Sequence, residues 1–422
     1  MPADRQVCVV GTTSDYIDWI RLHHPGEAFF LTDRLHRLQA REAAPDAAEE
    51  LLCNLADYED VRRSLRQQIT TYGLHLEGIA CFDCESLELA ALLAKEHGFP
   101  YVSPHSIEVC RDKWATKKIW QQQGIRCPLV NQVSSAADIA TFMANKAGAY
   151  VLKPLSGSGS ELVFHCSDMD QGKRCLQIMH GALRNKATHR LYRAGHNGPD
   201  TIVIEEYIAG PEFSADFLID EEGVEIIRLT EKSKASQAPF GTIRGYRLLS
   251  SPPAPVSIDK LCGIFAQAAR ALEISRAICM VDFIISNGEI VLLELTPRPG
   301  GDCLPALLRA ASGFDILGFS LAFARHQTMQ HLPPHDMPPM VGIRLLAHRS
   351  GIVKQINAER LERDPRVRDL AIIRSAGHRI CLPPEDYDSW LLGHLVFMPA
   401  EKPGWVEQGQ SMADQLTVEM VS

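Results

Sequence analysis

The sequence predicts a multidomain protein in which an α/β unit is followed by α+β units. The chain has 422 residues, which exceeds the size at which one hydrophobic core stops growing, so two to four domains are expected. Strand-like and helix-like segments alternate from residue 1 to about 105, which is typical of a parallel α/β layer. Beyond residue 200 strand-like segments follow one another directly, which favours antiparallel hairpins.

In the N-terminal part, apolar runs bounded by turn residues predict two strands and two helices. The strands span residues 7–10 and 78–82, and the helices span 15–22 and 86–97. The turn Gly11-Thr12-Thr13-Ser14 could hold a phosphate at a helix N-terminus, but a single glycine is weak support and a plain turn is favoured. A further helix is expected at residues 112–123, because Gly124 and Pro128 follow it as stop signals.

The middle of the chain is richest in predicted strands. They span residues 150–154, 201–207, 212–219, 224–229, 279–286 and 289–295, with a helix at 258–272. Asn287-Gly288 joins the last two strands and is the strongest short hairpin signal in the sequence. The polar residues 234–242 read as a loop or lid, and the proline-rich residues 332–339 indicate a boundary before a C-terminal α+β segment.

Composition excludes several classes of function. A net charge of −9 argues against nucleic acid as a partner, which requires clustered Lys and Arg. No apolar stretch approaches the roughly 20 residues of a membrane span, and no signal-peptide pattern opens the chain. The 12 cysteines lie mostly in apolar runs, which indicates reduced core thiols in a cytoplasmic protein. Cys81 and Cys84 form a CxxC without the second pair that zinc would require, so an ordinary pair of thiols is favoured.

A loop rich in glycine and serine follows the predicted strand at residues 150–154. Its glycines allow the backbone to approach a polyanion, its N–H and hydroxyl groups can donate to it, and Lys153 supplies a charge for phosphate. The residues concerned are Lys153, Gly157, Ser158, Gly159 and Ser160. The order of residues is not that of a Walker loop, and a flexible turn is the alternative.

Asp282 and Glu294 each interrupt an apolar strand that should be buried. A buried carboxylate must be paired, protonated or bound to a cation, because its isolated charge is very costly. The hairpin should bring the two side chains together, and two oxygen ligands without His or Cys suit magnesium. Ordinary salt bridges, for instance with Arg298, are the alternative.

Two further segments could contribute to a site. Arg298 lies between two prolines just beyond the second strand, where it is preorganised to meet an anion or developing charge. The segment at residues 203–212 is a strand that leaves into a turn, and its backbone could read an adenine edge while Glu212 accepts from ribose hydroxyls. By itself, that segment is better explained as a plain strand and turn.

In their order along the chain, these motifs resemble the ATP-grasp superfamily. The matching segments are Arg111-Asp112-Lys113 with residues 124–128, Leu152-Lys153-Pro154 with residues 157–160, Glu205–Ile208 with Gly210 and Glu212, Asp282-Phe283, and Glu294–Arg298 with Gly300-Gly301. The resemblance implies an ATP-grasp fold with an N-terminal Rossmann-like α/β domain and a C-terminal α+β domain. It implies an N-terminal domain over residues 1–110, a small lobe over 111–200, a large lobe over 201–331 and a ligase-type domain over 332–422, similar to that of L-amino-acid ligases.

The resemblance also implies roles for individual residues. Lys113 and Lys153 would hold the α- and β-phosphates of ATP, and the glycine loop would close over the β- and γ-phosphates. The adenine hinge would comprise Glu205, Glu206, Tyr207 and Ile208, with Glu212 on the ribose. Asp282 and Glu294 would hold Mg²⁺ or Mn²⁺, together with Thr296, which replaces the asparagine of most relatives and could leave a weakened site.

The implied activity is an ATP-dependent carboxylate–amine ligase that proceeds through an acyl phosphate, with small-molecule carboxylate and amine substrates. Arg298, Gly301 and Lys232 would be the catalytic residues, and Arg244 and Asp302 would contact substrate, although a solvated loop arginine is an equal reading of Arg244. A carboxylase of the biotin-carboxylase or purine type is an alternative, weakened by the lack of a Met-Lys-Met carrier segment in the sequence. A nucleotide-binding protein with a degenerate site is a second alternative, suggested by Thr296. A homodimer is common in the family.

Overall fold

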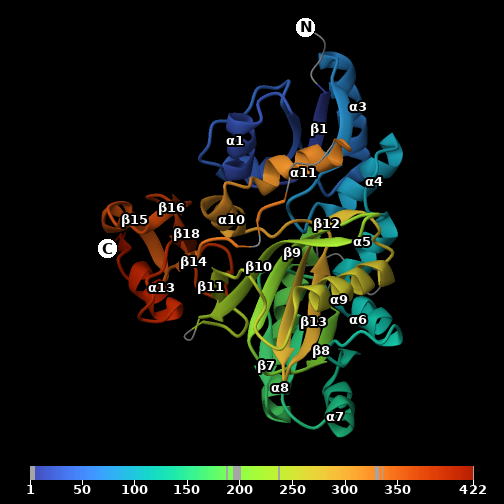
Figure 1. Ribbon diagram of the computed structural model, residues 1–422, viewed down its shortest axis with the longest axis vertical. Helices are drawn as coiled ribbons and strands as arrows, with labels where there is room; N and C mark the ends of the chain where they lie inside the picture. Colours follow the sequence, from blue (N-terminus) through green and yellow to red (C-terminus); the bar gives the residue numbers. More distant parts are fainter. Residues whose placement is uncertain are drawn as a thin grey trace.

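A computed structural model describes residues 5–186, 189–192, 201–235, 238–327, 332–334 and 336–421. The chain forms an N-terminal α/β unit, a small lobe and a large antiparallel sheet that continues into the C-terminal segment (Figure 1). This mixture of a parallel sheet with antiparallel sheets confirms the predicted fold class.

The N-terminal unit is built on a parallel four-stranded sheet with the order β3-β2-β1-β4. Its strands are β1 (Arg5–Val10), β2 (Ala28–Asp33), β3 (Glu50–Cys53) and β4 (His75–Ala80). Its helices are α1 (Ser14–His23), α2 (Arg34–Gln39), α3 (Tyr58–Tyr72), α4 (Leu87–His97) and α5 (Pro104–Arg111). The strand order changes direction between β1 and β4, so the loops after these strands meet at the crevice where open α/β sheets bind ligands.

The small lobe is an antiparallel sheet with the order β5-β8-β6-β7. Its strands are β5 (Val130–Val133), β6 (Tyr150–Pro154), β7 (Phe164–Cys166) and β8 (Ile202–Glu206), and its helices are α6 (Lys113–Gln122), α7 (Ala136–Asn145) and α8 (Met169–Asn185). Helix α6 is capped by Asp112, whose side chain accepts from the N–H groups of Trp114 and Ala115 at 2.9 and 2.7 Å. This cap fixes Lys113 as the first residue of the helix.

The large sheet has eight strands in the order β13-β12-β9-β10-β11-β14-β18-β16. The first five in sequence are β9 (Glu212–Ile219), β10 (Val224–Lys234), β11 (Ile243–Leu248), β12 (Ala277–Ser286) and β13 (Glu289–Thr296). Helix α9 (Ile258–Ala271) covers one face, where Phe265 stacks with Phe217 and meets Phe283 edge to face. Because side chains alternate along a strand, this apolar contact assigns the other residues of each strand to the opposite face.

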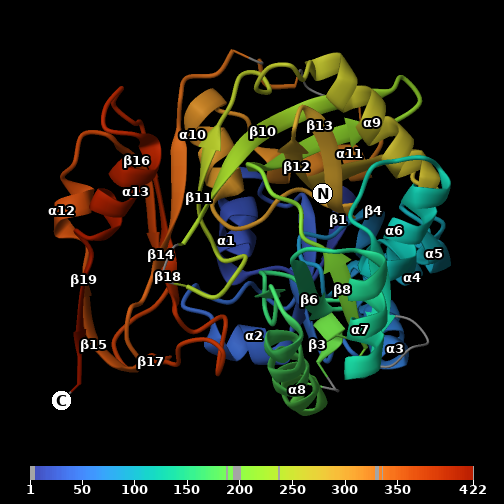
Figure 2. The ribbon, with the colours of Figure 1, turned by 90° about the horizontal axis from the view of Figure 1, so that it is seen from below.

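The C-terminal segment extends the same sheet. The added strands are β14 (Val341–Leu346), β16 (Val367–Ile372) and β18 (Leu391–Phe397), and a smaller sheet contains β15 (Gly351–Asn357), β17 (Arg379–Ile380) and β19 (Thr417–Met420). Helices α12 (Glu359–Glu362) and α13 (Trp405–Ala413) complete the segment, which lies to one side of the molecule (Figure 2). Strand β14 pairs directly with β11, so sheet pairing crosses the boundary expected near residue 331. The four domain boundaries stay predictions.

Two helices connect the large sheet to the N-terminal unit. They are α10 (Leu304–Ser312) and α11 (Ile316–Ala324). Helix α11 lies against β4, where a side chain at Gly78 would overlap the carbonyl group of Ala324. Among the described residues, no single helix is long and apolar enough to cross a membrane; α10 and α11 meet the length and composition only together, across a 101° bend.

Candidate active site

The candidate site lies on the face of the large sheet opposite α9. Four charged residues come from four adjacent strands: Glu212 from β9, Lys232 from β10, Asp282 from β12 and Glu294 from β13. Asp282 is the register partner of Glu294, which confirms that the hairpin brings the two carboxylates together, and of Ser214 on its other side. The period-2 alternation that buries the phenylalanines places Glu212 and Asp282 on this face, and the irregularity between Asp282 and Phe283 brings Glu294 opposite Asp282.

Lys232 links two of the carboxylates. Its Nζ lies 2.6 Å from Asp282 Oδ2 and 3.1 Å from Glu212 Oε1. Burial alone would lower the pKa of Lys232, but Asp282 and Glu212 raise it overall, so the lysine stays charged. The salt-bridge partner of Asp282 is therefore Lys232 and not Arg298. Burial also raises the pKa of Asp282, against the opposing effect of Lys232, which indicates a carboxylate short of positive charge.

The carboxylate pair fits a hard divalent cation. Asp282 Oδ1 is buried and has no hydrogen-bond partner among the described residues. Burial would raise the pKa of Glu294, but Lys113 and Lys153 lower it overall, so this side chain is ionised. Thr296, only 7% exposed, lies two residues further along β13. The described residues contain no group of three His, Cys, Asp or Glu that could hold a metal. Two carboxylates suit Mg²⁺, which is usually bound through one or two carboxylates and substrate phosphates.

Two lysines share one buried glutamate beside the carboxylate pair. Glu205 on β8 lies 2.8 Å from Lys153 and 2.9 Å from Lys117, which also donates to Leu293 O at 2.7 Å. Burial would raise the pKa of Glu205, but the two lysines lower it overall. Glu205 therefore lies among the lysines. Lys117 was missed by the sequence reading, although it falls one helical turn after Lys113 and so lies on the same face of α6.

Lys117 gives a testable dependence of stability on pH. Burial lowers its pKa from 10.5 to about 8, so between these two values the unfolded chain binds more protons at this residue than the folded chain. The free energy of unfolding of the parent should therefore rise relative to Lys117→Met between pH 8 and pH 10, by about 2 kcal/mol. Denaturant unfolding of both proteins at several pH values measures this difference. Lys118→Met is the matched control, and a constant or falling difference would contradict the prediction.

The glycine loop carries several residues in the left-handed region. Gly157, Gly159 and Ser160 have φ of 145°, 68° and 62°, so the chain here doubles back tightly. Lys113 Nζ donates to Gly157 O at 3.0 Å and lies 3.9 Å from Glu294 Oε2, which connects the loop to the carboxylates. Ser160 Oγ donates to Gly241 O at 2.7 Å, so the loop between β10 and β11 also meets the glycine loop. Ser158, which lies between Gly157 and Gly159, is exposed.

The expected adenine hinge follows β8 and is lined by aromatic rings. Tyr207 meets His165 edge to face at 4.6 Å and Phe240 at 6.2 Å between ring centroids. Ile208 is buried beside Ile284 and Val291. The N–H of Glu206 donates to Leu129 O, and its carboxylate lies 3.0 Å from Lys146. Glu212, beyond the hinge, also pairs with Lys234 at 3.1 Å. His165, Phe240 and Lys234 were not anticipated, because they come from segments far apart in sequence.

Arg298 reaches across to the N-terminal unit. Its Nη2 and Nε donate to Cys84 Sγ at 2.9 and 3.2 Å, and its Nη1 donates to Pro299 O at 2.7 Å. Gly301 lies beside this guanidinium, since a side chain there would start 3.8 Å from Nη1. Cys84, one of the two CxxC thiols, therefore contacts Arg298. The sequence predicted an ordinary thiol here and not a metal ligand.

The turn that carries Arg298 is anchored at two points. Gly300 N–H donates to Asp216 Oδ1 at 2.9 Å, and Asp216 forms a buried pair with Arg228 at 2.8 Å. Asp302 lies 3.2 Å from Arg344 on β14. The Asp216–Arg228 pair was not anticipated from the sequence. This pair fixes the turn to the large sheet through Gly300, and Asp302 fixes the turn to β14 through Arg344.

The structure does not bring Arg244 to this cluster. It lies in β11, is 8% exposed, and donates from Nη2 to Gln410 Oε1 on α13 at 3.2 Å. It is therefore neither a solvated loop arginine nor a contact of the lysines and carboxylates among the described residues.

Known proteins are similar to this chain in sequence and in fold. Residues 147–306 match the family model described as an ATP-grasp domain. The protein y4rH of Sinorhizobium fredii is 24% identical over 289 residues, which cover 66% of this chain and 55% of that protein. A D-alanine–D-alanine ligase of Desulforudis audaxviator is 24% identical over 250 residues, which cover 57% of this chain and 76% of the ligase. The chain thus spans little more than half the length of the first of these relatives.

Solved structures extend the similarity to the whole chain. The L-amino acid ligase from Bacillus licheniformis superimposes with a TM-score of 0.76 at 17% identity, covering 100% of both chains. The N5-carboxyaminoimidazole ribonucleotide synthetase from Thermotoga maritima gives 0.65 at 15% identity, covering 99% of this chain and 100% of the other. Residues 147–306 therefore match an ATP-grasp domain, and the chain as a whole has the fold of these two solved structures.

Proposed function

We propose that this protein is an ATP-dependent ligase that joins a carboxylate to an amine, with amino acids as the substrate class. One observation carries the proposal: Asp282 and Glu294 face the lysine cluster and the glycine loop on one sheet face. A D-alanine–D-alanine ligase and an L-amino acid ligase among the similar proteins support this class of reaction.

Each group has a defined task in this proposal. Lys113 and Lys153 hold the phosphates, while Gly157, Ser158, Gly159 and Ser160 cover the β- and γ-phosphates through N–H and hydroxyl groups. Tyr207 and its neighbours Glu206 and Ile208 line the adenine, and Glu212 accepts from the ribose. For the last role Glu212 must release Lys234, whose side chain is 38% exposed.

Asp282, Glu294 and Thr296 would hold Mg²⁺, which neutralises charge on the triphosphate. Lys232 keeps Asp282 oriented and adds a positive charge on the same side. Glu205 spaces Lys117 and Lys153 apart and so positions them for phosphate. The chain supplies positioning and electrostatic stabilisation, which is how phosphoryl transfer is mainly catalysed.

The two chemical steps balance without any further reagent. A carboxylate oxygen of the first substrate attacks the γ-phosphorus of ATP, so a C–O–P linkage forms, the bond to the bridging β–γ oxygen breaks, and ADP leaves. The amine nitrogen then attacks the acyl carbon, phosphate leaves, and the nitrogen gives up a proton as the amide forms. Arg298 and the Gly301 N–H would stabilise charge on the acyl oxygen. Gly241, in the loop between β10 and β11, accepts from Ser160 of the glycine loop. These two loops together can exclude water from the acyl phosphate.

A pairwise screen of amino acids tests the proposal. Phosphate release from MgATP should require both a carboxylate and an amine substrate, and the product mass should equal the sum of the two minus water. ADP formation that needs bicarbonate and no amine would instead identify a carboxylase. Nucleotide binding without turnover across the screen would indicate a degenerate site. Thr296→Asn would then be the first substitution to test for recovered turnover.

A further inference from the structure

A three-residue segment after α8 connects the N-terminal sheet with the glycine loop. This segment is the 3₁₀ turn Arg190–Tyr192, here called the strap. Its middle residue, Leu191, is 7% exposed and belongs to the apolar core of the small lobe. The two outer side chains point to different parts of the molecule, and neither is used in the chemistry proposed above.

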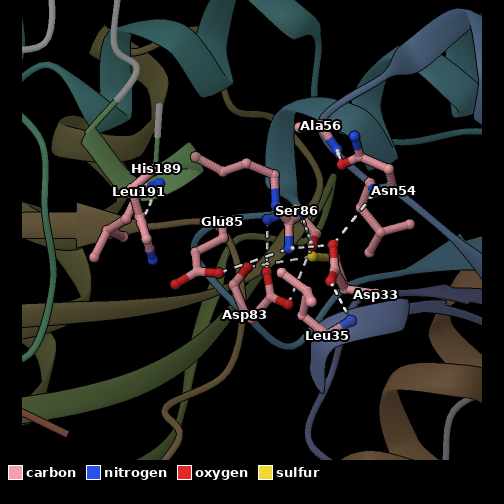
Figure 3. Close-up of polar contacts among 12 residues, drawn as sticks. Asp33, Leu35, Asn54, Ala56, Asp83, Glu85, Ser86, His189 and Leu191 are labelled. Carbon is pink, nitrogen blue, oxygen red and sulfur yellow. Dashed lines mark hydrogen bonds and ion pairs between the residues drawn. The ribbon is translucent and has the colours of Figure 1, made fainter. Parts of the chain in front are cut away.

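Arg190 reaches the loops that follow β2 and β4, where its partners Asp33, Glu85 and Ser86 are labelled in Figure 3. Its Nη1 donates to Ser86 Oγ at 3.0 Å, and its Nη2 lies 3.7 Å from Glu85 Oε2 and 3.8 Å from Asp33 Oδ2. Asp33 ends β2, and Glu85 and Ser86 precede α4. The Arg190 side chain is 13% exposed, so these charges interact with little screening by water.

The loops that receive Arg190 are themselves rigid. Asp83 Oδ1 accepts from Ser86 N at 2.6 Å, and Asp33 Oδ1 accepts from Leu35 N at 2.9 Å as the cap of α2 (Figure 3). Gly11 at the end of β1 has φ of 65°, and a side chain there would overlap Ser86 Oγ. Tight packing against Gly11 therefore fixes the hydroxyl that Arg190 contacts.

Tyr192 at the other end of the strap contacts the glycine loop. Its hydroxyl donates to Glu161, which also pairs with Lys186. The Tyr192 ring lies against Gly157, since a side chain there would start 3.4 Å from the ring. One aromatic residue therefore supports the loop at its beginning and at its end.

The backbone of the strap is held from a third direction. Arg111 Nη2 donates to Arg190 O at 2.8 Å and to Leu191 O at 3.2 Å. Arg111 ends α5, two residues before Lys113, which itself donates to Gly157 O. The same helix junction thus fixes the strap and the glycine loop relative to one another.

We propose that Arg190 and Tyr192 are positioning residues that hold the glycine loop over the nucleotide phosphates by tying it to the N-terminal sheet. The inference rests on the proposed function only in taking the glycine loop as the phosphate cover. The anchoring loop also contains Cys84, whose thiol accepts from Arg298. The strap therefore connects the glycine loop with Arg298, the residue proposed to stabilise the acyl phosphate. Loss of the Arg190 or the Tyr192 contacts should make the glycine loop more mobile.

Hydrogen exchange and nucleotide binding on the full chain test the inference. The variants are Arg190→Met, Tyr192→Phe, their combination, and Arg190→Lys, with Arg184→Met as the control because Arg184 is an exposed arginine on neighbouring α8. Loss of a charge-assisted hydrogen bond should raise the exchange rate of amides 156–162 and the Kd for a non-hydrolysable MgATP analogue by about tenfold each. Exchange in β13 should not change.

Three results are expected together. Tyr192→Phe should reproduce the effect of Arg190→Met, the combined variant should be no worse than either because both break one connection, and Arg190→Lys should recover part of the effect. The inference would be overturned if the amide exchange rate at residues 156–162 in Arg190→Met stays within twofold of that in Arg184→Met. It would also be overturned if the increases in exchange rate of the two single variants multiply in the combined variant. Because neither readout needs turnover, a parent that proves inactive as a ligase would refute the proposed function and leave this result standing.

Discussion

Replacing Glu294 by glutamine lowers phosphate release from MgATP by about a thousandfold, equivalent to about 4 kcal/mol of activation free energy. The substitution keeps the shape of the side chain but removes a charge that the lysine cluster holds ionised. Without it, the divalent cation loses one of two carboxylate ligands and Lys113 loses a partner 3.9 Å away. Steady-state kinetics over a series of Mg²⁺ concentrations measures the effect.

Glu289→Gln is the matched control for this prediction. Glu289 starts the same strand β13 but is exposed, so its loss should leave turnover within twofold of the parent. Glu294→Gln activity within tenfold of the parent, with an unchanged dependence on Mg²⁺, would show that Glu294 is not a metal ligand.

Replacing Arg298 by methionine lowers amide formation by a factor of roughly 10² to 10³ while the Kd for nucleotide stays within about twofold. Arg298 contacts Cys84 and the Pro299 carbonyl and none of the lysines or carboxylates of the nucleotide cluster among the described residues, so its removal should spare the ATP site. Product formation and nucleotide affinity are measured on the same preparation.

Arg298→Lys should recover only part of the rate, because an ammonium group cannot present two parallel donors to an acyl phosphate. Arg270→Met on α9 is the control, since Arg270 is exposed on the covering helix. If nucleotide affinity falls in proportion to product formation, Arg298 acts by holding the N-terminal unit in place and not on the acyl group.

The hairpin of β12 and β13 shows what a local pattern can predict. Asn287 and Gly288 have φ of 51° and 79°, as a two-residue hairpin turn requires, and this turn sets the pairing from Ser286–Glu289 as far as Phe283–Leu292. Continued unchanged, that register would place Asp282 opposite Leu293, but an irregularity between Asp282 and Phe283 pairs Asp282 with Glu294 instead. The proximity of the two carboxylates could therefore be predicted from the turn and the interrupted apolar runs, which are local features, whereas their direct pairing could not.

Features that depend on contacts distant in sequence could not be deduced in the same way. Glu205 looks like a hinge residue in its strand, but Lys117 and Lys153 approach it from two other elements. Arg244 follows a polar loop, yet β11 is an interior strand because β14, about a hundred residues later, pairs with it. Strand β3 was missed because it has only four residues, whereas β2 has six and follows the turn signal Pro25-Gly26, so its local pattern was present and overlooked.

Oxygen transfer from substrate to phosphate tests the central claim most directly. When the carboxylate substrate is labelled with ¹⁸O in both oxygens, attack of the carboxylate on the γ-phosphorus predicts that each released phosphate carries one ¹⁸O atom and that the amide keeps the other. Mass spectrometry of the phosphate after turnover reads the outcome. Unlabelled phosphate formed together with the amide would contradict an acyl-phosphate intermediate and with it the proposed mechanism.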